Sequence, residues 1–247
     1  MFFEKNQKTR PDPFFSILSL KVRPRFPIMY VFALRESGEM KDKLKVLGLF
    51  GSPRRGGNTD LLLEEMLKGA EEAGAHIERI RISGLEFSPC IECHGCDDTG
   101  ECVLEDDMEK VYPQLLEADC IILASPIFFY GVTAWTKSLI DRVQSLWVRK
   151  YRLKSLPGKG RRGFFISVGA TKGSRLFDGA VLTVKYFFDA VGADFAGQLL
   201  FKGIEDKGDI RNHPTALQEA FEAGKKLVEK CGMKYRRDTG ENPLSEG

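Results

Sequence analysis

Short apolar runs and longer amphipathic stretches alternate along the chain from residue 43 onward. Runs that are apolar at nearly every position are typical of buried strands, and stretches with apolar residues three or four positions apart are typical of helices. The run at 77–82 alternates apolar with charged residues, which indicates a strand nearer the edge of a sheet. In chain order the pattern predicts strands at 44–50, 77–82, 120–124, 163–168 and 195–201, and helices at 58–73, 106–117, 133–147, 174–191 and 213–231.

The regular alternation of strands and helices predicts an α/β fold with a parallel sheet. Strands that are apolar on both faces predict that helices cover both sides of this sheet. Five strands suit the doubly wound, three-layered, flavodoxin-like arrangement with strand order 2-1-3-4-5. In that arrangement a ligand lies at the carboxyl ends of the first, third and fourth strands, so the loops that follow them are candidates for one binding site.

The loop after the first strand, GSPRRGGNT at 51–59, has the composition of a phosphate site. Its glycines let the backbone approach a ligand, and the helix that follows directs its N-terminal N–H groups and partial positive charge toward the loop. The loop fits neither the Walker pattern nor G-x-G-x-x-G, and a glycine-rich turn that merely joins strand to helix is the alternative. The side chains that we expect to contact a phosphate are Ser52, Arg54, Arg55, Asn58 and Thr59.

The loop after the third strand, SPIFFYG at 125–131, places three consecutive aromatic residues at the same edge of the sheet. A loop at this edge does not easily bury Phe128, Phe129 and Tyr130, and a flavin ring would cover them. Packing in the core or in an interface is the alternative, because exposed aromatic residues mark interfaces more often than cofactors. The residues that we expect to line the flavin are Pro126, Ile127, Phe128, Phe129, Tyr130 and Gly131, with Thr171 after the fourth strand closing the third side.

Four cysteines occur within thirteen residues, in the run CIECHGCDDTGEC, and they are the strongest chemical signal in the sequence. Thiolates at i, i+3 and i+6 with a fourth close behind suit one 4Fe–4S cluster, held in a loop at 84–105 between the second strand and the next helix. Zinc is a weaker alternative, because its four-cysteine sites usually combine two Cys-x2-Cys pairs a dozen or more residues apart. Thiols or disulfides without metal, and a variant site with His94 as a ligand, also remain open. The expected ligands are Cys90, Cys93, Cys96 and Cys102.

The overall composition limits the classes of function. The chain has 247 residues, 43% of them hydrophobic, and a formal net charge of +2, so charge favours neither nucleic acid nor a membrane as a partner. No apolar run approaches the length of a membrane span, and nothing indicates export, so we expect a cytoplasmic protein. Seven Lys and Arg and no acid lie at 148–162. Such a run suits the extra phosphate of NADPH or an acidic electron carrier, but it is more often a solvated loop.

The first 39 residues differ from the rest, with four prolines and no sustained periodicity. We interpret residues 1–39 as a disordered extension or as the product of a misassigned start codon ahead of Met40. The flavodoxin-like FMN domain is expected at 40–232, with the cysteine loop inserted at 84–105, and residues 233–247 are expected to form a polar tail.

Four stretches together resemble the NADPH-dependent FMN reductase superfamily: GSPRRGGNT, the cysteine run followed by EDDM, SPIFFYG, and the later SLIDR. The cysteine run is similar to that of one branch, the iron–sulfur flavoproteins of anaerobic archaea and bacteria, and the resemblance covers about residues 43–231. It implies FMN and one 4Fe–4S cluster as cofactors. By position it implies phosphate contacts from Ser52, Arg54, Asn58 and Thr59, a flavin wall from 126–131, and a cluster held by Cys90, Cys93, Cys96 and Cys102.

The resemblance implies an oxidoreductase, an electron-transfer flavoprotein that passes electrons between the cluster and FMN. It also implies a ferredoxin-like electron donor and a homodimer or homotetramer in which a cluster faces the flavin of a neighbouring subunit. NAD(P)H is a further candidate substrate, and the acceptor is a small molecule or a protein. No side chain is expected to act as a catalytic acid or base, because the chemistry belongs to the cofactors. Two alternatives are a cluster-free NAD(P)H-dependent FMN or quinone reductase and a zinc- or thiol-based redox-sensing binding protein.

Overall fold

The structure is a computed structural model that describes residues 43–156 and 160–239, with side chains described up to Cys231 in the last helix. The expectations for residues 1–39 and for the end of the polar tail lie outside these residues. Among the helices that the described residues form, none combines the length and the hydropathy that a membrane span requires.

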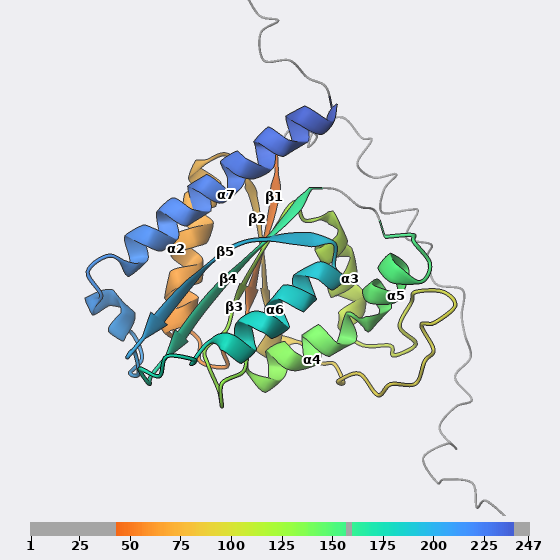
Figure 1. Cartoon of the computed structure of the whole chain (residues 1–247), viewed down its shortest axis with the longest axis horizontal. Helices are drawn as coiled ribbons and strands as arrows, with labels where there is room; N and C mark the ends of the chain where they lie inside the picture. The colour runs from red at the N-terminus through yellow and green to blue at the C-terminus, as the bar shows by residue number, and fades with distance from the viewer. Residues whose placement is uncertain (1–42, 157–159, 240–247) are drawn as a thin grey trace, which may run out of the picture.

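Five parallel strands form one sheet (Figure 1). In chain order they are β1 (Lys45–Phe50), β2 (His76–Arg81), β3 (Cys120–Ala124), β4 (Arg161–Gly169) and β5 (Ala193–Lys202). The order across the sheet is β2-β1-β3-β4-β5, which confirms the predicted flavodoxin-like topology. The register pairs Phe50 with Ala124 and Ala124 with Ile166, so β1 and β3 end level while β4 continues beyond them.

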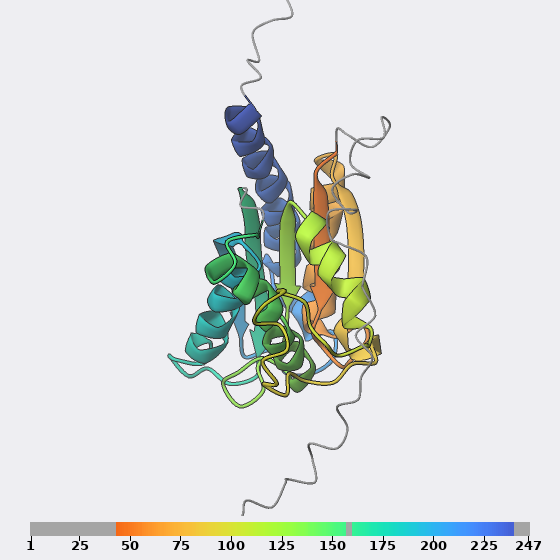
Figure 2. The ribbon, with the colours of Figure 1, turned by 90° about the vertical axis from the view of Figure 1, so that its right-hand side faces the viewer.

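Helices cover both faces of the sheet (Figure 2). The helices α2 (Asn58–Glu72) and α7 (Ala216–Thr239) lie on one face. The other face carries α3 (Met108–Glu117), α4 (Ala134–Arg142), α5 (Gln144–Tyr151) and α6 (Asp178–Ala190). Two short 3-10 helices, η3 (Ile82–Gly84) and η4 (Asp209–Asn212), lie in the connections. The three predicted layers are therefore present.

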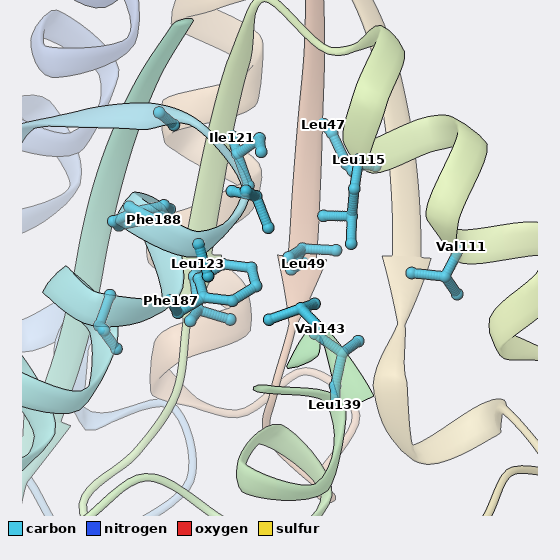
Figure 3. Close-up of a cluster of buried hydrophobic side chains, with 14 of the residues drawn as sticks. Leu47, Leu49, Val111, Leu115, Ile121, Leu123, Leu139, Val143, Phe187 and Phe188 are labelled. Carbon is cyan, nitrogen blue, oxygen red and sulfur yellow. The ribbon is translucent and has the colours of Figure 1, made fainter. Parts of the chain in front are cut away.

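The central strands are apolar throughout because successive residues of a strand point to opposite faces and both faces are covered. Leu47 and Leu49 of β1 pack with Ile121 and Leu123 of β3 on the α3–α6 side. Figure 3 shows this cluster together with Phe187 of α6. The intervening residues of the same strands pack against α2 and α7.

Two predicted helices end differently in the structure. The stretch 133–147 forms two helices, α4 and α5, because Val143 between them adopts ψ of 8° and its N–H donates to the carbonyl of Ile140, three residues back. The last helix passes its predicted end at Cys231 and continues through part of the expected polar tail to Thr239. Met, Lys and Arg favour a helix by their intrinsic propensity, even where no apolar periodicity marks one. A prediction from periodicity alone therefore makes this helix too short.

Cys120 of β3 and Cys231 of α7 meet on the α7 side of the sheet, where a disulfide joins them with Cα atoms 7.2 Å apart. Nothing in the sequence predicts this pair, because its members are 111 residues apart. The four cysteines of the 90–102 run are not part of a disulfide.

Candidate functional site

The loops after β1, β3 and β4 meet at the carboxyl edge of the sheet. The main-chain N–H of Gly51, just after β1, donates to Ala124 O of β3 (2.7 Å), and Thr133 Oγ1 donates to Gly51 O (2.7 Å). The N–H of Ile127 donates to Val168 O of β4 (3.0 Å). These bonds join the end of β1 to β3 and to the start of α4, and they tie the loop after β3 to the end of β4.

Gly51 is a point of close approach between the first two of these loops. A Cβ atom here would lie 2.2 Å from Thr136 Oγ1 and 2.7 Å from Ala124 O. Thr136 is fully buried and its Oγ1 lies 2.9 Å from Thr133 Oγ1, so this hydroxyl cannot swing away freely. Glycine at this position therefore lets the two loops share one site.

The loop from Gly51 to Thr59 presents two cations beside the start of α2. Arg54 and Arg55 are exposed, whereas Ser52 is buried and its Oγ accepts the N–H of Arg54 (3.1 Å), which shapes the turn. The first N–H groups of any α-helix lack an intrahelical partner. Here the helix begins after Gly57, and no capping side chain accepts from these groups. Two arginines beside an uncapped helix N-terminus favour an anion.

Asn58 differs from the other predicted phosphate contacts, because its side chain is engaged within the protein. Its Nδ2 donates to Asp206 O (2.8 Å), and its Oδ1 accepts the N–H groups of Gly208 (2.9 Å) and Ile210 (3.3 Å). Asn58 therefore ties α2 to the connection after β5, and its main-chain N–H is the group left for a ligand. Thr59, next along the helix, is buried.

Asp60 is a residue of this region that sequence reasoning missed. Its carboxylate accepts the N–H of Gly56 (2.9 Å) and pairs with Arg81 of β2 (2.8 Å). The Asp60 side chain is almost buried, so the pair braces the turn and keeps its negative charge neutralised. Its signal in the sequence is a lone acid in the first helical turn, a common complement to the helix dipole.

The aromatic loop after β3 is an exposed and strained turn. Main-chain bonds of 2.9 Å join Phe128 and Gly131 in both directions, and Phe129 and Tyr130 between them have φ of 49° and 63°. Large side chains rarely adopt this left-handed conformation, which costs about 1–3 kcal/mol per residue and clusters at functional sites. The exposed fractions are 48% for Phe128, 103% for Phe129 and 58% for Tyr130. Packing in the core is therefore wrong for these rings, and an apolar surface remains for a flavin or an interface.

Thr171 is exposed in the loop after β4. In the same loop, the position that a Cβ atom would take at Gly173 lies 3.7 Å from Tyr130 Oη, and Lys202 Nζ donates to Gly173 O (2.7 Å). These contacts place the loop beside the aromatic turn. The other predicted residues of the flavin wall, Pro126, Ile127 and Gly131, are half-buried.

The predicted flavin edge is open to solvent, because its arginines, its three aromatic rings and Thr171 are exposed. A cavity of about 740 Å³ lies between α6 and β5, and none of the residues predicted to contact FMN or the cluster lines it. A pocket of about 200 Å³ lies where the cysteine loop meets α4, with Phe87 and Trp135 among its walls. This pocket joins the predicted cluster loop to the helix that follows the aromatic loop, so the two regions are neighbours in space.

The cysteine loop runs without helix or strand between η3 and α3, at the same end of the sheet (Figure 2). The first two cysteines of the run are exposed and the last two are half-buried. Glu92 and His94, on either side of Cys93, have left-handed φ of 52° and 56°. Within the described ranges, no three His, Cys, Asp or Glu side chains form a group that could hold a metal ion. The loop therefore carries the predicted donors without assembling them around one point.

A buried ion pair ties the two ends of the cysteine loop together. Asp106 accepts the N–H groups of Ser88 (3.3 Å) and Met108 (3.0 Å). Arg142, the last residue of α4, donates Nη1 to Ser88 O (2.7 Å) and Nη2 to Asp106 Oδ1 (3.1 Å), and its side chain is fully buried. Sequence reasoning assigned a role to neither residue. In the sequence, Asp106 stands out only as part of EDDM and Arg142 only as part of SLIDR. That the two side chains form an ion pair is visible only in the structure.

Arg142 also lies within electrostatic range of Cys102. Burial lowers the pKa of Arg142, but its bond to Asp106 and the neighbouring Tyr112 and Cys102 raise that pKa by more, so the guanidinium stays charged. Its Nε is buried and has no hydrogen-bond partner among the described groups. Buried donors normally have a partner, so a group that accepts a hydrogen bond from this Nε would complete the arrangement.

The surroundings of the Cys96 thiol, two other cysteines among them, disfavour its thiolate form. Burial raises the pKa of Cys96, its main-chain hydrogen bond partly offsets this, and the neighbouring Asp97, Cys102 and Cys90 raise the pKa further. The segment 84–105 contains six Asp and Glu and no Lys or Arg, so thiolates there repel one another and their surroundings. A shared metal cation would remove that repulsion.

The basic run at 148–162 is not one solvated loop, because its first residues belong to α5, its last belong to β4, and Arg149 and Arg161 are buried. Two of its cations contact the acidic cysteine loop. Arg149 is buried and its Nε donates to Gly100 O (2.7 Å). Arg152 pairs with Asp97 (2.8 Å), and the hydrogen bond from Arg152 is the main cause that lowers the pKa of Asp97. The two segments of opposite charge therefore neutralise each other in part.

Known proteins match this chain in sequence. The model of the family described as NADPH-dependent FMN reductase matches residues 44–190. An iron–sulfur flavoprotein of Methanocaldococcus jannaschii is 34% identical over 196 residues, which are 75% of this chain and 96% of that protein. An iron–sulfur flavoprotein of Archaeoglobus fulgidus is 30% identical over 201 residues, which are 81% of this chain and 86% of that protein.

Solved structures match the fold. An NAD(P)H:quinone oxidoreductase from Methanothermobacter marburgensis superposes with a TM-score of 0.58 at 19% identity, over 75% of this chain and 96% of that one. An FMN-dependent NADH-azoreductase from Bacillus anthracis, solved in complex with FMN, superposes with a TM-score of 0.55 at 16% identity, over 74% of this chain and 99% of that one. At these identities the similarity shows the fold alone.

Proposed function

Because this chain belongs to the NADPH-dependent FMN reductase family, it is a flavodoxin-like oxidoreductase, and we propose that it holds FMN and one 4Fe–4S cluster and passes electrons between them. The observation that carries the proposal is the position of two neighbouring regions at one end of the sheet. One is an open edge with cations and exposed aromatic rings, and the other is a loop with four cysteines outside any disulfide.

The flavin edge supplies contacts for both ends of FMN. Arg54, Arg55 and the uncapped start of α2 would hold the phosphate, with Ser52 and Thr59 beside them. The isoalloxazine ring would lie against the exposed turn Phe128–Gly131. Backbone strain of the kind seen in this turn persists where function requires it, which supports a ligand contact over a chance conformation.

The cysteine loop supplies the donor set of a 4Fe–4S cluster, which takes four thiolates. Cys90, Cys93, Cys96 and Cys102 would be the ligands. The buried charge of Arg142, which interacts electrostatically with Cys102, supports an anionic group near this cysteine. Since the cysteines are not assembled around one point within the described ranges, ligation requires the loop to rearrange.

When bound, the cluster supplies single-electron transfer and FMN supplies storage of an electron pair. The residues of the chain position and tune these groups. Arg54 and Arg55 would balance the charge of the phosphate, and Arg142 places a buried positive charge within electrostatic range of Cys102, which favours the addition of negative charge there. No side chain is assigned as a catalytic acid or base.

The flavin half of the proposal is tested by replacing Arg54 and Thr59 together with alanine. Each substitution removes a charge-assisted or hydroxyl hydrogen bond worth about 1–3 kcal/mol, so the Kd for FMN should rise about 30-fold or more. Titration of apoprotein with FMN, followed by flavin fluorescence, measures this. Arg79→Ala is the control, because Arg79 of β2 pairs with Glu64 of α2 and both side chains are exposed. A double variant that binds FMN as tightly as wild-type protein places the phosphate elsewhere.

The cluster half is tested by Cys96→Ser. The variant should lose most of its iron and keep its FMN, because the flavin loops are separate in sequence from the cysteine loop. It should also lose reduction by a one-electron, ferredoxin-like donor while chemical reduction of the flavin continues. His94→Ala, in the same loop, is the control and should keep its iron. Unchanged iron in Cys96→Ser rejects the cluster assignment.

A cluster-free NAD(P)H-dependent FMN or quinone reductase is the second candidate, because the described cysteines are not assembled as a metal site. Such a protein would contain FMN without iron after anaerobic purification, and NADH or NADPH would reduce its flavin directly. A zinc-bound protein would be distinguished by metal analysis. The ferredoxin-like donor and the homodimer or homotetramer rest on the resemblance, and donor-dependent reduction and sedimentation test them.

A further inference from the structure

The segment between Cys96 and Cys102 rests on one buried side chain of α5. Arg149 is 9% exposed, and its Nε donates to Gly100 O (2.7 Å), within this segment. The N–H of Gly100 donates to Cys96 O (2.8 Å), so the same glycine closes the turn that leaves Cys96. Arg149 thus contacts the main chain of the loop just before it reaches its fourth cysteine.

Gly100 fits Arg149 by shape as well as by hydrogen bonding. Its φ is 69°, in the left-handed region that favours glycine. A Cβ atom at this position would lie 2.3 Å from Arg149 Cγ and 3.0 Å from Arg149 Nε. Backbone conformation and direct contact therefore both exclude a side chain at residue 100.

The neighbouring contact between α5 and the loop is more exposed. Arg152 pairs with Asp97, but these side chains are 51% and 32% exposed, and solvent-exposed pairs of this kind contribute little. Arg149 instead makes a buried, charge-assisted bond to the main chain, which is stronger and has one geometry. Arg149 is therefore better suited than Arg152 to fix the course of the loop.

We propose that Arg149 is a positioning residue for the metal-binding cysteines: by holding Gly100 against α5, it sets where Cys96 and Cys102 lie relative to each other. The inference rests on the proposed function in one respect, namely that these cysteines bind a cluster. Arg149 acts through the main chain of Gly100 and through its ion pair with Glu101 (3.3 Å), the residue before Cys102, so its effect can be measured on the thiols themselves, without any metal.

Thiol reactivity of the reduced, iron-free protein measures this placement. In wild-type protein, Cys96 and Cys102 should react with DTNB more slowly than the two exposed cysteines, and mass spectrometry of labelled peptides assigns each rate. In Arg149→Gln the same two thiols should react at least about tenfold faster, because loss of a charge-assisted hydrogen bond opens the loop. Arg152→Gln is the matched control three residues along the chain, and its Cys96 and Cys102 should react no faster than those of wild-type protein, because it removes only the exposed pair with Asp97.

Iron retention measures the consequence for ligand binding. Protein loaded with iron and sulfide without oxygen and then mixed with a chelator should lose iron at least about tenfold faster in Arg149→Gln than in wild-type protein or Arg152→Gln. Gly100→Ala disturbs the same contact from the loop side and leaves α5 unchanged. It carries the test if Arg149→Gln fails to fold, which FMN content and circular dichroism report.

Wild-type thiol reactivity in both Arg149→Gln and Gly100→Ala would overturn the proposal. Slow thiols in the control and fast thiols in these two variants would support it. If wild-type protein binds no iron, the proposed cluster function fails, while the thiol rates still decide whether Arg149 positions Cys96 and Cys102.

Discussion

Replacing Arg142 with glutamine should destabilise the protein far more than removing an exposed cation from the same helix. The guanidinium of Arg142 is fully buried and bonds to Ser88 O (2.7 Å) and to Asp106, whose side chain is 13% exposed. Glutamine is shorter and uncharged, so it cannot reach both partners. The substitution would leave the carboxylate of Asp106 without its cation and would untie the two ends of the cysteine loop.

The expected loss of stability follows from the burial of this pair. Removing one partner of a buried ion pair typically costs about 3–5 kcal/mol, because the remaining charge is left uncompensated. Lys137 on the same helix pairs with Asp141, but these side chains are 52% and 41% exposed. An exposed pair is worth about 0–1 kcal/mol, so Lys137→Gln should lie close to wild-type protein. The difference between the two variants should be at least about 2 kcal/mol.

Equilibrium unfolding in urea, with the iron-free and flavin-free protein under reducing conditions, measures both free energies. The slopes of the two transitions should match that of wild-type protein, which shows that the variants unfold from the same native state. If the loss for Arg142→Gln lies within about 1 kcal/mol of the loss for Lys137→Gln, the prediction is wrong, and Arg142 and Asp106 do not behave as a buried, mutually dependent ion pair.

Two further predictions concern the flavin edge. Phe129→Asn should stabilise the flavin-free protein by about 1 kcal/mol, because asparagine tolerates the left-handed φ of 49°, yet it should weaken FMN binding. Thermal unfolding measures the first effect and flavin titration the second. A loss of stability together with unchanged FMN affinity would contradict both expectations. Gly51→Ala should destabilise the protein by about 1–3 kcal/mol and lower its FMN affinity, because the Cβ of the alanine would lie 2.2 Å from Thr136 Oγ1. If the variant unfolds and binds FMN like wild-type protein, the two loops do not need this close approach.

The fold could be predicted from the sequence because its signal is local. The run Cys120–Ala124 is apolar at every position, and a strand covered on both faces explains that pattern. Strands and helices alternate regularly, and five strands in such an alternation suit the doubly wound α/β fold with the order 2-1-3-4-5. The convergence of the loops after β1, β3 and β4 followed from that order alone.

Contacts between distant segments could not be predicted in the same way. Asn58 has an amide that suits a phosphate, but the N–H of Gly208 that it accepts is 150 residues away in sequence. Arg149 belongs to a basic run that reads as solvated, because the sequence does not show that the acidic cysteine loop packs against it. The cysteine spacing predicts the ligands of a cluster, whereas their final geometry depends on the metal that they share.

The cofactor content of the protein, purified without oxygen, tests the central claim most directly. We expect about four iron atoms, about four acid-labile sulfides and about one FMN per chain, with visible absorption beyond the flavin bands that dithionite bleaches. Protein that contains FMN but neither iron nor sulfide, or that contains zinc in their place, would contradict it.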